Sequence, residues 1–153
     1  MNETKYIVAT DGASNTNHIK ANQFSIAGWG ALVLKDGTYI HKLSGRIDGV
    51  LATNIRAELV AALEGLKATP LGSSVELFTD SEYVIKGLTE WMDNWKRKGW
   101  RNSAKKPVAH KDLWTELDEL YQNRDVQLTW VKGHSGHLLN EEADTLAKEA
   151  MTS

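Results

Sequence analysis

The sequence predicts an α/β fold in which helices flank a five-stranded mixed sheet. Three observations lead to this prediction. Five apolar stretches of strand length recur along the chain, and segments with apolar residues at helical spacing separate the later ones. The pair Asp36-Gly37 joins two of these stretches and predicts a tight antiparallel hairpin. Strands that are separated by helices need parallel crossover connections, so the sheet combines both kinds of pairing.

The N-terminal part of the chain contains a strand, a loop and the hairpin. Residues 5–11 become apolar toward their end and form the first predicted strand, whereas the polar residues 12–25 form a loop. The hairpin covers residues 26–45. Gly28 and Gly30 lie inside its first strand, which indicates that another element approaches the backbone closely there.

Helices and strands alternate in the remainder of the chain. Residues 53–67 form a helix because Ile55 and Leu59 begin an apolar series at helical spacing, and Thr53 or Asn54 can cap its start. The same criteria place the other elements in this order: a strand at 75–79, helices at 81–89, 91–98 and 111–123, a strand at 126–131 and a helix at 140–150.

The composition is that of an ordinary globular domain. With 153 residues, 41% of them hydrophobic and 25% charged, the chain fits a single domain over residues 1–153 with a core of its own. No apolar run approaches the length of a membrane span, and the N-terminus has no signal-peptide pattern. We therefore expect a cytoplasmic monomer without a membrane partner. The absence of cysteine excludes disulfides and thiolate metal sites.

Basic residues are concentrated in one segment, residues 91–111, which we call the basic protrusion. It carries seven Lys and Arg residues against a single Asp, a net charge of +6, so the total of -2 leaves -8 for the rest of the chain. Such a local excess predicts a polyanionic partner. The segment also contains Trp91, Trp95 and Trp100. The spacing of the first two is that of the apolar stripe of a short helix, so we expect an aromatic base with a cationic rim.

Two predicted strands each end in a Thr-Asp pair. Taken singly, each acid has a structural explanation: Asp11 can form a turn, and Asp80 can cap a helix. A carboxylate in either place accepts backbone hydrogen bonds. In an α/β sheet, however, functional sites form at the carboxyl ends of the strands. If the two strands are neighbours, the two carboxylates face each other and repel, and a divalent cation would stabilise them together.

Two further acids strengthen this interpretation. Glu58 lies on the apolar side of its helix, where a carboxylate needs a partner. Asp144 lies in the first turns of the last helix, where an acid also favours the helix dipole without any other role. Four oxygen donors without cysteine are typical of Mg²⁺ or Mn²⁺ sites, and two such ions ~4 Å apart suit phosphodiester hydrolysis. A structural Ca²⁺ site is the competing explanation, although the spacing of an EF-hand is absent.

Five motifs, taken together and in order, resemble ribonuclease H of type 1, the bacterial ribonuclease HI kind. They are TDG after the first strand, NIRAEL on the first helix, TDSEYV after the fourth strand, NWKRKGW in the basic protrusion and VKGHSGHLLNEEAD near the end, and the similarity runs from about Tyr6 to about Lys148. The resemblance implies the ribonuclease H-like fold, in which the first three strands are antiparallel and the later ones parallel. It also implies an endonuclease that cuts the RNA strand of an RNA–DNA hybrid with two Mg²⁺ ions, or Mn²⁺ in their place, and leaves 5′-phosphate and 3′-hydroxyl ends.

The resemblance assigns roles to individual residues. The acids that hold the metal ions and act in catalysis are Asp11, Glu58, Asp80 and Asp144. His134 takes the place of a loop histidine that handles protons or releases product. Thr53 resembles a residue that grips a DNA phosphate, and Asn54 one that contacts the RNA 2′-hydroxyl. The residues of the basic protrusion that bind substrate, without reading its sequence, are Trp91, Trp95, Lys96, Arg97, Lys98, Trp100 and Arg101.

The chain departs from the pattern of this family at three places. The loop at 12–25 lacks the usual glycines and prolines, Ile55 stands where many members have a second asparagine, and Glu82 replaces a common glutamine and adds negative charge near the metal ions. Two alternative functions stay open: a non-catalytic module that binds hybrids, and a DNA nuclease or integrase that shares the fold. The four acids argue against the first, because a protein that only binds gains nothing from buried carboxylates.

Overall fold

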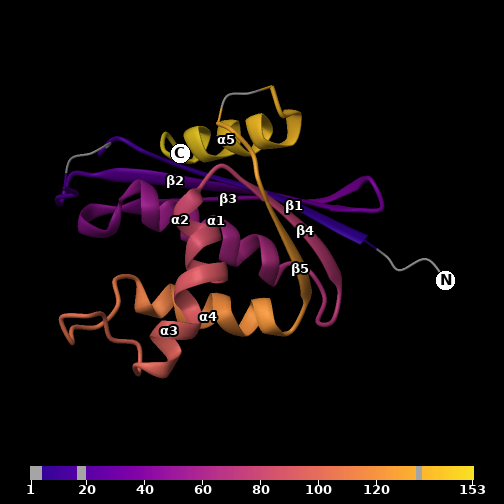
Figure 1. Ribbon diagram of the computed structural model, residues 1–153. Helices are drawn as coiled ribbons and strands as arrows, with labels where there is room; N and C mark the ends of the chain where they lie inside the picture. The colour runs from indigo at the N-terminus through magenta and orange to yellow at the C-terminus, as the bar shows by residue number, and fades with distance from the viewer. Residues whose placement is uncertain (1–4, 17–19, 134–135) are drawn as a thin grey trace.

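Strands from both halves of the chain form one sheet. In a computed structural model, which describes residues 5–16, 20–133 and 136–153, the strands follow the order β3-β2-β1-β4-β5 (Figure 1). The first three strands pair antiparallel, and β4 and β5 continue the sheet in parallel to β1. The strands span Lys5–Ser14 (β1), Ile26–Lys35 (β2), Thr38–Asp48 (β3), Ser74–Thr79 (β4) and Asp125–Trp130 (β5). The predicted mixed sheet of five strands is confirmed.

Helices cover both faces of this sheet. One face is covered by α1, α4 and the helical segment that contains α2 and α3, whereas α5 lies on the other face (Figure 1). The helices span Asn54–Lys67 (α1), Glu82–Lys86 (α2), Met92–Arg97 (α3), Lys111–Gln122 (α4) and Leu138–Ala150 (α5), and a 3-10 turn at Gly49–Leu51 precedes α1. In the part of the chain that the structure describes, no helix is long and apolar enough to cross a membrane.

The main core lies between the sheet and the helices of the first face. Val8 and Leu77 from the sheet, Leu59 from α1 and Trp114 from α4 are fully buried there. Gly87 borders this core, because a Cβ atom at this position would lie 2.0 Å from the Trp114 ring. Burial of these apolar side chains stabilises the domain and holds α1 against β1.

Two glycines of β2 allow α5 to approach the opposite face of the sheet closely. A Cβ atom at Gly30 would lie 2.4 Å from the carbonyl oxygen of Ala143, and one at Gly28 would lie 2.0 Å from that of Ala147. Both distances are far below van der Waals contact, so only glycine fits at these positions. The predicted close approach is confirmed, and the approaching element is the helix that carries Asp144.

Turn and cap signals in the sequence mark the ends of several elements. Asp36-Gly37 has positive φ angles of 48° and 84°, as a two-residue hairpin turn requires. The hydroxyl of Thr53 accepts a 3.1 Å hydrogen bond from a backbone N–H in the first turn of α1 and caps that helix. Ser81 caps α2 in the same way. The side chain of Asp80 is therefore not needed as the cap of α2.

The first strand is longer than predicted. β1 continues to Ser14 instead of ending at residue 11, because its polar last residues still pair with β2, with Ser14 opposite Ala27. Gly12 is therefore part of the strand and not of a turn. Asp11 does not end β1 but lies two residues beyond Ala9, the last residue of β1 that pairs with β4.

Two helix boundaries also differ from the prediction. The helices expected at 81–89 and 91–98 form one continuous helical segment, in which a π-helical turn at Gly87–Trp91 joins α2 to α3. The last helix begins at Leu138, two residues before the predicted start, because the imidazole of His137 caps its first turn.

Candidate active site

Three acids, two of them buried and one half-buried, meet where the parallel pairing of β1 and β4 ends. Asp11 projects from β1, Asp80 follows the last residue of β4, and Glu58 comes from α1. One oxygen of each carboxylate lies within 4.8 Å of the others. Asp11 and Glu58 are each only 5% exposed. The structure thus brings together three of the four acids that the sequence predicts, and we call them the acid cluster.

The backbone of Gly12 holds Glu58 in place. Its N–H lies 2.7 Å from Glu58 Oε1 and 2.9 Å from Asp11 Oδ1 and donates to both. A Cβ atom at Gly12 would lie 2.7 Å from the backbone nitrogen of Glu58, so a larger residue would push α1 away from β1. This role of Gly12 is not among the sequence predictions, although a glycine inside a strand is the same signal that marks Gly28 and Gly30.

Burial and mutual repulsion make the acid cluster hard to ionise. Burial raises the pKa of Asp11 to about 8; the interaction with Glu58 opposes this rise, and the charges of Asp80 and Asp144 add to it. Burial also raises the pKa of Glu58 well above its ordinary value, and the charges of Asp11 and Asp80 contribute next. Within the described residues, neither Asp11 nor Glu58 forms an ion pair with Lys or Arg.

The donor atoms of the acid cluster fit a hard divalent cation. The Oε2 atom of Glu58 is buried and has no hydrogen-bond partner among the described residues, so a lone pair there is available to a ligand. Carboxylate oxygens are the ligands that Mg²⁺ and Mn²⁺ prefer. A cation would also supply the positive charge that Asp11 and Glu58 lack. The cluster of Asp11, Glu58 and Asp80 could therefore bind a metal ion.

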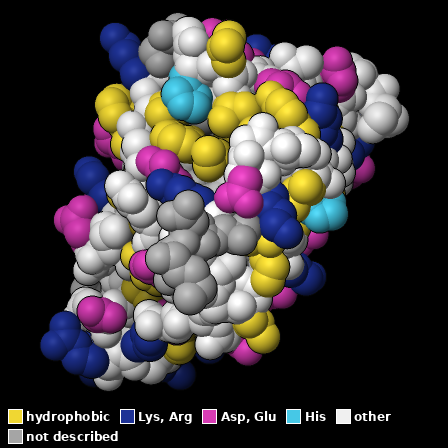
Figure 2. All heavy atoms as spheres, turned by 90° about the vertical axis from the view of Figure 1, so that its right-hand side faces the viewer, with side chains coloured by type: hydrophobic (Ala, Val, Ile, Leu, Met, Phe, Trp, Pro, Cys, Tyr) yellow, Lys and Arg dark blue, Asp and Glu magenta, His cyan; other side chains and the backbone are white. Residues whose placement is uncertain are grey.

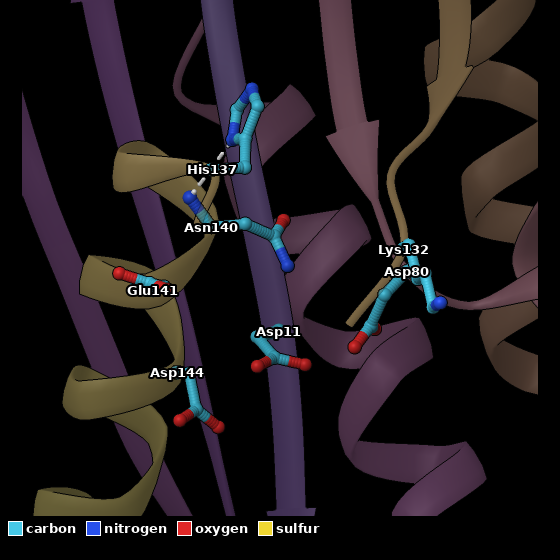
Figure 3. Close-up of a pocket in the computed structure, with 7 residues that line it drawn as sticks. All are labelled: Asp11, Asp80, Lys132, His137, Asn140, Glu141 and Asp144. Carbon is cyan, nitrogen blue, oxygen red and sulfur yellow. Dashed lines mark hydrogen bonds between the residues drawn. The ribbon is translucent and has the colours of Figure 1, made fainter. Parts of the chain in front are cut away.

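Asp144 lies beside the acid cluster rather than within it. It projects from α5 toward the cluster, across from Asp11 (Figure 3). Its carboxylate is not among the oxygens within 4.8 Å of one another, and it forms a 3.0 Å ion pair with Lys148 one turn along α5. Asp144 and the three clustered acids line the same cleft, which has a volume of about 300 Å³. The predicted fourth acid is thus close to the cluster and is partnered by a lysine.

Asn54 lies at the edge of this cleft, next to Thr53, the cap of α1. Asn54 is the first residue of α1, is exposed, and lines the cleft together with Ile55. The side chain of Ile55 is 41% exposed there, which gives the cleft an apolar patch where an asparagine would give a polar one. The helix cap uses a lone pair of the Thr53 hydroxyl and not its hydrogen, so the group can still act as a donor.

A second, small cavity adjoins the acid cluster on the side of α5 (Figure 3). It has a volume of about 10 Å³ and is lined by Asp11, Asp80, Lys132, His137, Asn140, Glu141 and Asp144. Asn140 is not among the predicted site residues. It shares the buried side of α5 with Ala143 and Ala147, and a polar residue in such an apolar series is the signal that could have found it. His134, the predicted loop histidine, lies outside the described residues.

The tryptophans of the basic protrusion pack on one another beside a groove. The ring of Trp95 lies 5.8 Å from Trp91, 6.4 Å from Trp100 and 5.3 Å from the buried Trp114, measured between centroids. A groove of about 450 Å³ adjoins two of these rings, and its lining includes Tyr83, Trp91, Trp95, Lys98 and Arg101. The protrusion thus has the aromatic base and the cationic rim that its sequence predicts.

The basic side chains of the protrusion are not equivalent. Lys98 and Arg101 line the groove, and Arg97 is exposed. Lys96 instead reaches α4, where its Nζ forms a 3.1 Å ion pair with Asp118, so its charge is already compensated. In the described part of the molecule, the face turned away from the basic protrusion has no comparable basic cluster, because basic and acidic side chains are interspersed there (Figure 2).

Glu82 does not add charge to the acid cluster. It is exposed at the start of α2 and forms a 3.8 Å ion pair with Lys86 one turn further on. It lines neither of the two cavities beside the acids. Its expected effect on metal binding is therefore small.

Relatives of known family match nearly the whole chain. The family model for RNase H matches residues 3–152. A ribonuclease H of Hahella chejuensis is 47% identical over 148 residues, 94% of this chain and 94% of the relative. One of Hydrogenovibrio crunogenus is 52% identical over 124 residues, 81% of this chain and 83% of the relative. The chain belongs to the ribonuclease H family.

Solved structures share the fold. LC9-RNase H1, a type 1 RNase H with the type 2 active-site motif, superposes with a TM-score of 0.83 at 25% identity and covers 99% of this chain and 74% of its own. A foamy viral protease-reverse transcriptase, solved in complex with an RNA/DNA hybrid, contains the same fold with a TM-score of 0.73 at 22% identity, over 97% of this chain and 20% of its own. The predicted family, fold and enzyme class are confirmed.

The raised pKa of Asp11 predicts that the metal-free protein loses stability as the pH rises. The carboxyl has a pKa of about 8 in the folded chain and 3.8 as its ordinary value. Its contribution to the free energy of unfolding is therefore complete below pH ~4 and is lost as the pH rises through 8. The asparagine of Asp11→Asn cannot ionise, so we expect the wild type to lose about 3 kcal/mol more than this variant between pH 6 and pH 9 in EDTA.

Chemical denaturation at the two pH values measures this difference. Asp125→Asn is the matched control, because Asp125 is exposed at the start of β5, at the opposite end of the parallel strands from the acid cluster. The control should keep the pH dependence of the wild type. An equal pH dependence of the wild type and Asp11→Asn would show that burial does not hold a proton on Asp11.

Proposed function

We propose that the chain is an endonuclease that hydrolyses the RNA strand of RNA–DNA hybrids with two Mg²⁺ ions, for which Mn²⁺ can substitute. The observation that carries this proposal is the acid cluster, whose buried members Asp11 and Glu58 have no Lys or Arg partner among the described residues. Buried carboxylates without positive partners destabilise a fold, so a module that only binds hybrids would gain nothing from them. Membership of the ribonuclease H family supports a hybrid rather than duplex DNA as the substrate.

The acid cluster would hold the cations. Asp11, Glu58 and Asp80 would supply oxygen ligands, and Asp144 would join them by exchanging its ion pair with Lys148. When bound, the cations would lower the pKa of the attacking water and neutralise the charge that develops on the departing 3′ oxygen. The N–H of Gly12 donates to one oxygen of Glu58 and fixes its orientation, which leaves the other oxygen for a ligand. The expected products carry 5′-phosphate and 3′-hydroxyl ends.

The basic protrusion would bind the DNA strand of the hybrid. Lys98 and Arg101 line the groove and would contact phosphates, while Trp91 and Trp95 give the groove an apolar wall against which sugars can pack. Contacts to phosphates fix the position of a duplex without reading its sequence. We therefore expect cleavage that depends on the hybrid form of the substrate rather than on its sequence.

The start of α1 would distinguish the two strands. Asn54 presents a carboxamide that can donate to or accept from a 2′-hydroxyl, the group that separates RNA from DNA. The hydroxyl of Thr53 would donate its hydrogen to a DNA phosphate while its oxygen caps the helix. His134 would assist by transferring protons or releasing product. One chain supplies the groove, the cleft and the acids, so we propose that it acts as a monomer. We also propose that it works in the cytoplasm.

We expect Asp80→Asn to reduce hybrid cleavage by at least ~1,000-fold and to leave hybrid binding largely intact. The reason is that Asp80 is proposed to supply a charged oxygen to a cation, and a cation contributes several kcal/mol to the transition state. Cleavage of a labelled hybrid in Mg²⁺ and binding of the same hybrid measure the two properties. Asp125→Asn is again the control and should cleave like the wild type. Cleavage by Asp80→Asn at the wild-type rate would refute the assignment of the metal site.

We expect the double change Lys98→Ala and Arg101→Ala to weaken hybrid binding and to flatten its salt dependence. Each lost phosphate contact should reduce the slope of log affinity against log salt by roughly 0.9, or somewhat less on a hybrid. Lys96→Ala should change the slope less, because Lys96 is paired with Asp118. The turnover number at saturating hybrid should stay nearly constant, because these contacts are alike in the ground and transition states. Equal slopes of log affinity against log salt for the double variant and the wild type would show that the groove is not the substrate site.

A further inference from the structure

Asn140 is a buried polar residue that the proposed reaction does not use. Its side chain reaches from α5 into the small cavity and lies between His137 and Asp11 (Figure 3). The residue is only 5% exposed, and its Oδ1 atom has no hydrogen-bond partner among the described residues. Buried polar groups are hydrogen-bonded in roughly 90% of cases or more. We therefore look for a donor that the cavity can admit.

The cavity has the size and the polarity for one water molecule. Its volume of about 10 Å³ is close to the least space that a water needs. Asp11, Asp80, Lys132 and Asp144 also line it, whereas the side chain of Glu141 points away from it (Figure 3). A water in this cavity can donate one hydrogen to Asn140 Oδ1 and the other to a carboxylate. Its lone pairs then stay available to a cation.

We propose that Asn140 is a positioning residue for cation binding: through one water in this cavity, its carboxamide oxygen sets how tightly the acid cluster binds a hydrated divalent cation. The inference rests on the proposed function, in which the cluster binds that cation. Mg²⁺ loses its waters reluctantly and usually keeps several of them when a protein binds it. Groups that hydrogen-bond to the ligands of a metal orient them, and removing such a group typically lowers metal affinity ~10–100-fold.

An asparagine suits this position for two reasons. Its amide oxygen accepts a hydrogen bond without adding a further negative charge to a cavity that Asp11, Asp80 and Asp144 already line. Its backbone is also fixed, because the N–H of Asn140 donates a 3.3 Å hydrogen bond to Nδ1 of His137 in the capped first turn of α5. A side chain on such a rigid turn can hold a water in a defined place.

Calorimetric titration of Mg²⁺ into the full chain, without nucleic acid, tests this inference. We expect Asn140→Ala to weaken Mg²⁺ binding about 10-fold. Asn140→Asp keeps an acceptor oxygen of the same reach and should bind Mg²⁺ at least as tightly as the wild type. Thr145→Ala is the matched control, because Thr145 is exposed on the same helix and its hydroxyl donates to the carbonyl of Glu141. The control should leave Mg²⁺ affinity unchanged.

Thermal unfolding in EDTA separates a positioning role from a structural one. Asn140→Ala should melt like the wild type, and a clearly lower melting temperature would show that Asn140 is structural and overturn the inference. An unchanged Mg²⁺ affinity in Asn140→Ala, or an equal loss in Asn140→Asp, would overturn the inference and leave the proposed function standing. A wild type that binds no Mg²⁺ would overturn the proposed function and the inference together.

Discussion

The 2.7 Å hydrogen bond from the N–H of Gly12 to Oε1 of Glu58 joins β1 to α1 at the point where each element carries an acid. A glycine is required there, because a Cβ atom would lie 2.7 Å from the backbone nitrogen of Glu58. Close packing of α1 on β1 buries Glu58 beside Asp11, and the parallel neighbour β4 places Asp80 at the same end of the sheet. The distance between α1 and β1 thus sets the spacing of Glu58 and Asp11, and the pairing of β4 with β1 sets the position of Asp80.

This arrangement costs stability and creates a site for a cation. Burial raises the pKa of both Asp11 and Glu58, so the protein without metal can ionise them only against a penalty. Four buried side-chain atoms in the described chain have no hydrogen-bond partner: those of Glu58 and Asn140 lie in and beside the acid cluster, that of Thr10 is on the residue before Asp11, and the Trp114 indole nitrogen lies in the main core. Proteins depart from complete polar satisfaction mainly at functional sites. The apolar packing around α1 holds the acids together until cations and water supply the missing partners.

Features that depend on local periodicity could be predicted from the sequence, and features that depend on distant partners could not. Helical spacing identifies Glu58 as facing inward, and the end of an apolar stretch identifies Asp11. The extension of β1 to Ser14 is decided by the partner strand, since the residues themselves are polar. The pairing of Lys96 with Asp118 joins two helices and changes which cations of the protrusion are available, and no local pattern indicates it.

The central claim is that divalent cations complete the acid cluster. Anomalous diffraction from crystals grown with Mn²⁺ tests it most directly, because the anomalous signal locates the ion itself rather than its effect on activity. We predict anomalous density bounded by oxygens of Asp11, Glu58 and Asp80, at the distances typical of metal–carboxylate bonds, ~2.0–2.2 Å. Mn²⁺ bound elsewhere, with these three carboxylates in contact only with one another, would contradict the account.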